Sequence, residues 1–150
     1  MEIERKFLSP RLPEHLEEYP SKRLEQAYLC TDPALRVRRA GEEYILTCKG
    51  RGLMVRQELE MPLSRESYEH LLSKADGTVI RKERFFLPLG RYTVELDRFE
   101  APFAPLVMAE VEFPSVEEAE SFLPPDWFGR EVTEDPAYQN SSLSKRGTEA

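Results

Sequence analysis

The chain opens with Met1-Glu2-Ile3-Glu4-Arg5-Lys6-Phe7, a stretch in which Glu2, Glu4 and Lys6 occupy alternate positions. Successive side chains of a β-strand point to opposite faces, so these three residues would share one face. The stretch therefore predicts a strand that carries ionised groups along one side.

Six later segments repeat this pattern of charged residues at every second position. They are Arg36-Val37-Arg38, Ile45-Leu46-Thr47-Cys48-Lys49, Glu58-Leu59-Glu60, Lys82-Glu83-Arg84, Glu95-Leu96-Asp97 and Glu110-Val111-Glu112. One such segment is typical of the solvated face of an ordinary antiparallel sheet. Seven of them, with acids and bases grouped by strand and few Ser, Thr, Asn or Gln, favour a face that holds metal ions and a polyanion together.

The strand signals predict an α+β fold that is mostly β. Eight strands are expected, near residues 2–8, 25–31, 34–40, 43–49, 54–61, 79–87, 91–98 and 107–113. Eight antiparallel strands are enough to close a small barrel. With the ionised face inward, the barrel encloses a charged lumen, and helices must cover its apolar outside.

Helical signals occur in three places. A helix over residues 64–75 begins at Ser64 as the capping residue, and a second begins with the capping box Ser115-Val116-Glu117-Glu118. A short helix near residues 13–18 is crowded by prolines. We expect Trp127 to be a packing anchor, and residues 131–143 to form a loop and a closing helical turn.

Composition sets the class of protein. The 150 residues fit one domain, residues 1–150, with 40% apolar and 33% charged residues and a net charge of −7. An acidic chain argues against nucleic acid as the main partner. The sequence shows neither an apolar run of roughly 20 residues nor a signal peptide, so we expect a cytoplasmic protein without a membrane partner. The sequence leaves the oligomeric state open between monomer and homodimer.

The two cysteines, Cys30 and Cys48, are interpreted as small buried apolar residues.

The charged face suits phosphate chemistry held by side chains. Neither common glycine-rich phosphate loop occurs among the seven glycines. Arginine offers forked donors and lysine point charges, here Arg36, Arg38 and Arg84 with Lys6, Lys49 and Lys82. Eight acids share this face with the six bases. The resulting excess of negative charge would repel a triphosphate unless a divalent cation is added. Mg²⁺ or Mn²⁺ fits, because hard cations bind carboxylate oxygens.

The general base is left open among three residues: Lys49, if neighbouring cations lower its pKa, and Glu58 or Glu60.

Taken in order, these motifs resemble the CYTH superfamily, the triphosphate tunnel metalloenzymes. The E-x-E-x-K opening and the later charged pairs span nearly the whole chain. The EIERKFL start and the W-F-G, V-T-E-D and Y-x-N tail are most similar to short bacterial inorganic triphosphatases. The resemblance implies an eight-stranded antiparallel tunnel and a closing C-terminal helix, in which a plugging role for Lys145 or Arg146 is left open.

The resemblance also implies residue roles. Glu2, Glu4 and Glu112 would bind the catalytic metal, and Lys6, Arg36, Arg38, Lys82 and Arg84 would hold phosphates. Glu58 and Glu60 would lie opposite, near the attacking water or a second metal. Glu95, Asp97 and Glu110 match motif positions with less defined roles.

The expected substrate is inorganic triphosphate, hydrolysed to pyrophosphate and phosphate. Residues 31–43 contain no aromatic side chain that could form a shelf for adenine or thiamine. The alternatives are a thiamine triphosphatase or a class IV-type adenylate cyclase of the same fold, a polyphosphate- or nucleotide-binding module without turnover, and a sheet whose charged face is merely solvated.

Overall fold

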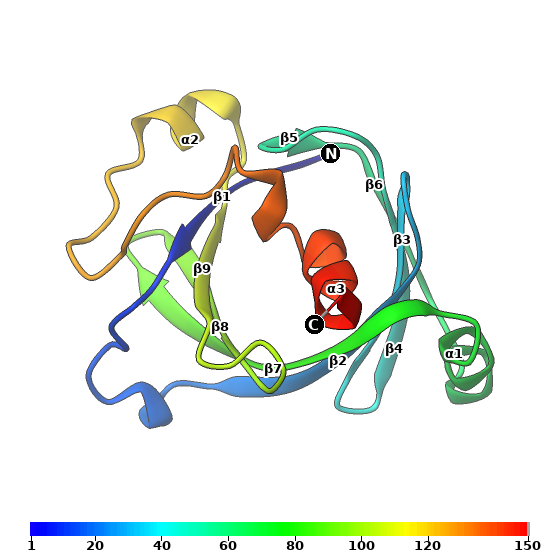
Figure 1. Ribbon diagram of the computed structural model, residues 1–150. Helices are drawn as coiled ribbons and strands as arrows, with labels where there is room; N and C mark the ends of the chain where they lie inside the picture. The colour runs from blue at the N-terminus through cyan, green and yellow to red at the C-terminus, as the bar shows by residue number, and fades with distance from the viewer. Residues whose placement is uncertain (150) are drawn as a thin grey trace.

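The computed structural model describes residues 1–149, with side chains through Lys145. Nine antiparallel strands form one sheet that curls into a nearly closed ring (Figure 1). The strands are β1 (Glu2–Leu8), β2 (Ser21–Thr31), β3 (Ala34–Ala40), β4 (Glu43–Lys49), β5 (Val55–Arg56), β6 (Glu58–Pro62), β7 (Asp76–Leu89), β8 (Tyr92–Phe99) and β9 (Val107–Glu112). Their order around the ring is β5-β1-β9-β8-β7-β2-β3-β4-β6. The predicted antiparallel barrel is confirmed.

The ring is completed where the chain runs from β5 to β6. β5 pairs with β1, and β6 pairs with β4. We expected one strand over residues 54–61, and the structure divides it at Gln57, which gives nine strands where eight were expected. Gly52, in the turn that precedes β5, has φ +129°, and a Cβ there would lie 2.2 Å from the carbonyl oxygen of Val55. Glycine is therefore required at that turn.

Helix α1 (Arg65–Leu72) covers one part of the outer wall. Ser64 caps it by accepting a hydrogen bond from the backbone N–H of Ser67. Its Tyr68 packs into a cluster with Ala27 on β2 and Val37 on β3. The apolar residues between the inward charges thus form the core under this helix, as the sequence predicts.

Helix α2 (Val116–Ser121) covers another part of the outer wall (Figure 1). Ser115 caps it by accepting from the N–H of Glu118. Ala119 packs against the outward residues of β7, β8 and β9, including Leu96 and Val111. Trp127 packs against this cluster and meets Phe128 edge-on, with the two ring centroids 4.6 Å apart. The packing role expected for Trp127 is confirmed.

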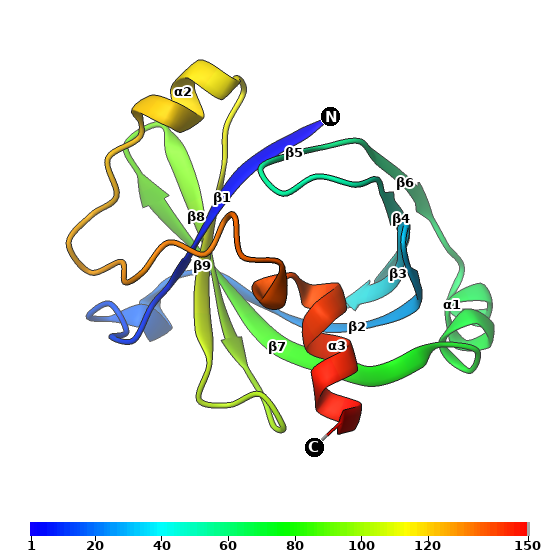
Figure 2. The ribbon, with the colours of Figure 1, turned by 45° about the horizontal axis from the view of Figure 1, so that its top comes forward.

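Two short 3₁₀ turns, η1 (Leu16–Glu18) and η2 (Pro136–Tyr138), precede β2 and the last helix. Helix α3 (Asn140–Glu149) begins inside the outline of the ring and runs outward at one mouth, packed on β7 and β2 (Figures 1 and 2). Leu143 anchors it in a cluster with Ile80 and Met108. The expected closing turn is a longer helix. The side chain of Arg146 lies outside the described residues.

The two cysteines are less buried than we expected. Cys30 is exposed and Cys48 is half-buried. The pairing of β2 with β3 shifts register between Tyr28 and Cys30. Such an irregularity re-aims side chains at a strand, which gives a reason for the exposure of Cys30. Among the helices described, none is long and apolar enough to cross a membrane.

Candidate active site

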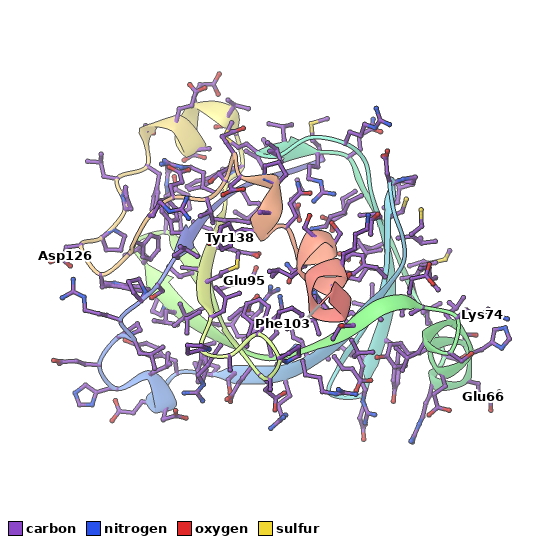
Figure 3. The ribbon with its side chains drawn as sticks, viewed as in Figure 1. Glu66, Lys74, Glu95, Phe103, Asp126 and Tyr138 are labelled. Carbon is purple, nitrogen blue, oxygen red and sulfur yellow. The ribbon has the colours of Figure 1, made fainter. Side chains whose placement is uncertain are left out.

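The interior of the ring holds a cavity of about 150 Å³ whose wall is almost entirely polar. Twelve of the fourteen charged residues predicted from the sequence line it. They are Glu2, Glu4, Lys6, Arg36, Arg38, Lys49, Glu58, Glu60, Arg84, Glu95, Glu110 and Glu112. Figure 3 shows Glu95 inside the ring. The prediction that these side chains share one lumen is therefore confirmed for all but Lys82 and Asp97.

Acids dominate the wall made by β1, β9 and β8. The register places Glu4 opposite Glu112 on β9, and Glu110 between Lys6 and Glu95. Burial, together with the negative charge of Glu110, raises the pKa of Glu4 to about 7. Lys6 provides a positive charge close to Glu4, with its Nζ 3.6 Å from a Glu4 oxygen. This wall is therefore short of positive charge.

Glu2, Lys49 and Glu58 form a separate cluster beside that wall. The Nζ of Lys49 donates to both Glu2 carboxylate oxygens at 3.0 Å and lies 3.7 Å from Glu58. The β4–β6 register causes this, because it sets Glu58 opposite Lys49. Burial and a hydrogen bond with Glu58 raise the pKa of Glu2. Lys49 thus sits between carboxylates, whereas its candidacy as a base assumed cationic neighbours.

Cations dominate the wall made by β3 and β7. Arg38 donates from Nε to the Gln26 Oε1 at 2.8 Å, and Arg36 donates from Nη2 to Thr47 at 3.2 Å. Within the described part of the chain, the buried Nε of Arg36 has no hydrogen-bond partner. Burial and the charges of Arg36 and Arg84 lower the pKa of Arg38 to about 9. An anion in the cavity would stabilise these charges.

Arg84 connects the two walls. Its guanidinium forms a two-pronged contact with Asp97, at 2.7 and 2.8 Å, and a further contact with Glu95 at 2.5 Å. Burial opposes ionisation of Asp97, but Arg84 and Lys82 outweigh it and lower the pKa of that carboxyl. Arg84 is therefore held in one orientation by a carboxylate that does not itself line the cavity.

Lys82 and Asp97 lie behind the cavity wall, and both are completely buried. The Nζ of Lys82 lies 2.6 Å from an Asp97 oxygen and donates to Asn140 Oδ1 at 3.1 Å. Helix α3 packs on β7 and on β2, and its first residue reaches Lys82. The alternation of β7 points Lys82 inward, but α3 separates it from the cavity.

Residues 1–145 match the CYTH domain. This chain belongs to the CYTH family. The CYTH chain is 41% identical over 148 residues to an inorganic triphosphatase of Nitrosomonas europaea, covering 95% of this chain and 96% of that one. An inorganic triphosphatase of Acetivibrio thermocellus is 38% identical over 117 residues, covering 76% and 73%. The crystal structure of an inorganic triphosphatase superposes with a TM-score of 0.71 at 39% identity, covering 96% of this chain and 94% of that one.

Several cavity residues of the CYTH chain were missed from the sequence. Arg56 lines the cavity from β5, two residues before Glu58. The alternation Arg56-x-Glu58-x-Glu60 carried the signal that could have found it. Tyr28 lines the cavity and also packs in the core. Gln139, Asn140 and Ser141 enter from the start of α3, where no strand pattern could reveal them.

The donor set of the CYTH chain suits a hard divalent cation. Among the described residues, no three Asp, Glu, His or Cys side chains are already grouped as metal ligands. Mg²⁺, however, uses few protein carboxylates and completes its shell with waters and substrate phosphates. The mutual repulsion of Glu4 and Glu110 is what a cation would relieve. CYTH triphosphatases are generally metal-dependent.

Proposed function

We propose that the CYTH chain hydrolyses inorganic triphosphate to pyrophosphate and phosphate, with Mg²⁺ or Mn²⁺ as the metal. One observation carries the proposal: a single cavity contains seven carboxylates and six cationic side chains, including Arg56. The relatives described above are inorganic triphosphatases and agree with it. Ala34 and Tyr28 are the apolar contributors to the described wall, which leaves little surface for an organic group.

The cationic side chains have a direct role in this reaction. Water oxygen attacks the terminal phosphorus, the bond to the bridging oxygen breaks, and the proton lost by water passes to a base. Charge then develops on the phosphoryl oxygens and on the leaving pyrophosphate. We propose that Lys6, Arg36, Arg38 and Arg84 stabilise that charge from the positions they already occupy.

The carboxylates divide between two roles in the proposal. Glu2, Glu4 and Glu112 would hold the metal, which when bound neutralises phosphate charge and can lower the pKa of water. Glu58 and Glu60 lie on β6 and line the same cavity, with Glu58 hydrogen-bonded to Glu2 and not opposite it, and they are candidates for the base. Lys49 lines the cavity between Glu2 and Glu58, and we assign it to holding phosphate.

The test is phosphate release from inorganic triphosphate with Mg²⁺, with Mn²⁺ and with EDTA, beside ATP and thiamine triphosphate. We expect rapid, metal-dependent release from inorganic triphosphate and much slower release from the two organic triphosphates. Faster release from thiamine triphosphate or cyclic AMP formation from ATP would replace the substrate in this proposal. Calorimetric binding of triphosphate without any product would show a binding module.

A further inference from the structure

The start of α3 is an unassigned part of the cavity wall. The cavity is lined here by Gln139, Asn140 and Ser141. Helix α3 begins at Asn140 and extends for ten residues away from the cavity. The first N–H groups of a helix lack intrahelical acceptors, and together with the helix dipole they favour an anion. The N–H groups of Ser142 and Leu143 donate to the carbonyl of Gln139. The first-turn positions at the cavity are therefore Asn140 and Ser141.

Lys82 fixes the orientation of the Asn140 amide. An ammonium group can only donate hydrogen bonds, so the amide must present its oxygen to the Nζ of Lys82, 3.1 Å away. Asp97 holds that Nζ from the other side at 2.6 Å. With its oxygen so engaged, Asn140 has its NH₂ donors left for the cavity that it lines.

A second and independent feature indicates an anion in the same cavity. Arg36 is 6% exposed, lines the cavity, and has an Nε without a partner among the described residues. Leaving a buried charged donor unsatisfied is costly, whereas a phosphate oxygen would accept from it. The cationic side of the cavity and the start of α3 thus both offer donors.

We infer that Asn140 is a phosphate-contacting residue and that, with the start of α3, it forms an end wall that binds one terminal phosphate group of the substrate. Lys82 then acts as a positioning residue, since it orients Asn140 and Asp97 without lining the cavity. This inference rests on the proposed function for the identity of the substrate. An end wall of this kind would limit how far a linear phosphate chain can enter.

Two substitutions at Asn140 separate this role from a merely structural one. Asn140→Asp keeps an acceptor for Lys82 and so keeps the helix anchored, but it replaces amide donors with a negative charge. Asn140→Ala removes both functions. If Asn140 only anchors α3, the aspartate variant should behave like the wild type and the alanine variant should be impaired. If Asn140 contacts phosphate, the aspartate variant should be the more impaired of the two.

The experiment measures binding of inorganic triphosphate by calorimetry in EDTA, and KM for triphosphate with Mg²⁺. We expect Asn140→Ala to weaken binding about tenfold or more, and Asn140→Asp to weaken it further. Ser142→Ala, on the same helix but outside the cavity wall, is the matched control and should bind as the wild type does. The melting temperature without ligand reports whether each variant folds.

The outcomes distinguish the inference from the proposed function. Wild-type binding by Asn140→Asp at an unchanged melting temperature would overturn the inference, even if the wild type hydrolyses triphosphate. If the wild type binds triphosphate without hydrolysing it, and Asn140→Asp does not bind, the inference stands and the proposed function fails. Should Asn140→Asp not fold, a KM for Asn140→Ala equal to the wild type would overturn the inference.

Discussion

The lumen has an acidic wall and a cationic wall, and each is destabilised by repulsion between its own like charges. On the acidic side, the pKa of Glu4 rises to about 7 because it is buried beside Glu110. On the cationic side, the pKa of Arg38 falls to about 9 because it is buried near Arg36 and Arg84. One wall would be relieved by a cation and the other by an anion. A metal and a polyphosphate would therefore each stabilise a different wall.

The largest effect should follow from disabling the acidic wall. Glu4→Gln and Glu112→Gln each remove a proposed metal ligand, and we expect kcat/KM for triphosphate to fall by about a thousandfold. The folded state should survive, because Glu4→Gln also removes repulsion with Glu110. Glu117→Gln, exposed on α2, is the control. Phosphate release near the wild-type rate in both lumen variants would refute the assignment of the metal to this wall.

The next effect comes from the cationic wall. Arg38→Ala removes a half-buried guanidinium at the cavity, and we expect kcat/KM to fall about a hundredfold. Arg39→Ala is the matched control, since Arg39 precedes the β3–β4 turn and donates to Gly41 outside the cavity. Steady-state kinetics on both variants check this. Equal losses in the two variants would mean that the position inside the lumen does not matter.

A smaller effect concerns stability and pH without metal. The pKa of Glu4 is raised in the folded state, so the folded protein binds more protons than the unfolded chain between about pH 4.5 and 7. The free energy of unfolding should therefore fall as pH rises through this window, by on the order of 1–3 kcal/mol from this group. Glu4→Gln should flatten that slope in urea melts performed in EDTA. If the pH dependence of the free energy of unfolding is the same in Glu4→Gln as in the wild type, the destabilisation assigned to Glu4 on the acidic wall is wrong.

The smallest effect is stabilisation by metal alone. In the proposed site Mg²⁺ would bind the ionised form of Glu4, so protons would compete with it below about pH 7. We expect added Mg²⁺ to raise the melting temperature by about 2–5 °C at pH 8, and by less at pH 6. Glu4→Gln should lose most of this shift. A larger shift at pH 6 than at pH 8 would point to a cation site elsewhere.

Period-two alternation made most of this molecule predictable. It specified which residues face inward, and hence the charged lumen, the apolar outer core and the helices that cover it. Alternation does not report depth, so it could not show that Lys82 and Asp97 are fully buried behind the cavity wall, with Lys82 bonded to the first residue of α3. Nor could it place Asn140, which reaches the cavity through tertiary packing of α3. Arg56 did carry the signal, because it shares its face with Glu58 and Glu60.

The division of the predicted strand at Gln57 was beyond local sequence reasoning, because it depends on which neighbour each half pairs with. β5 pairs with β1, whereas β6 pairs with β4. Similarly, the environment of Lys49 follows from the β4–β6 register. Both depend on contacts between segments that the sequence does not set side by side.

The crossing from β5 to β6 also gives the barrel a seam. There β1 meets β5 through Glu2–Arg56 and Ile3–Val55, whereas β7 and β8 pair along eight positions from Lys82–Phe99 to Leu89–Tyr92. Fewer hydrogen bonds are broken when the short ladder separates, so local opening of the wall should occur mainly there. Lys49 reaches across to Glu2 at this place. Amide hydrogens of residues 55 and 56 should exchange earlier than those of β7, and bound triphosphate should slow them.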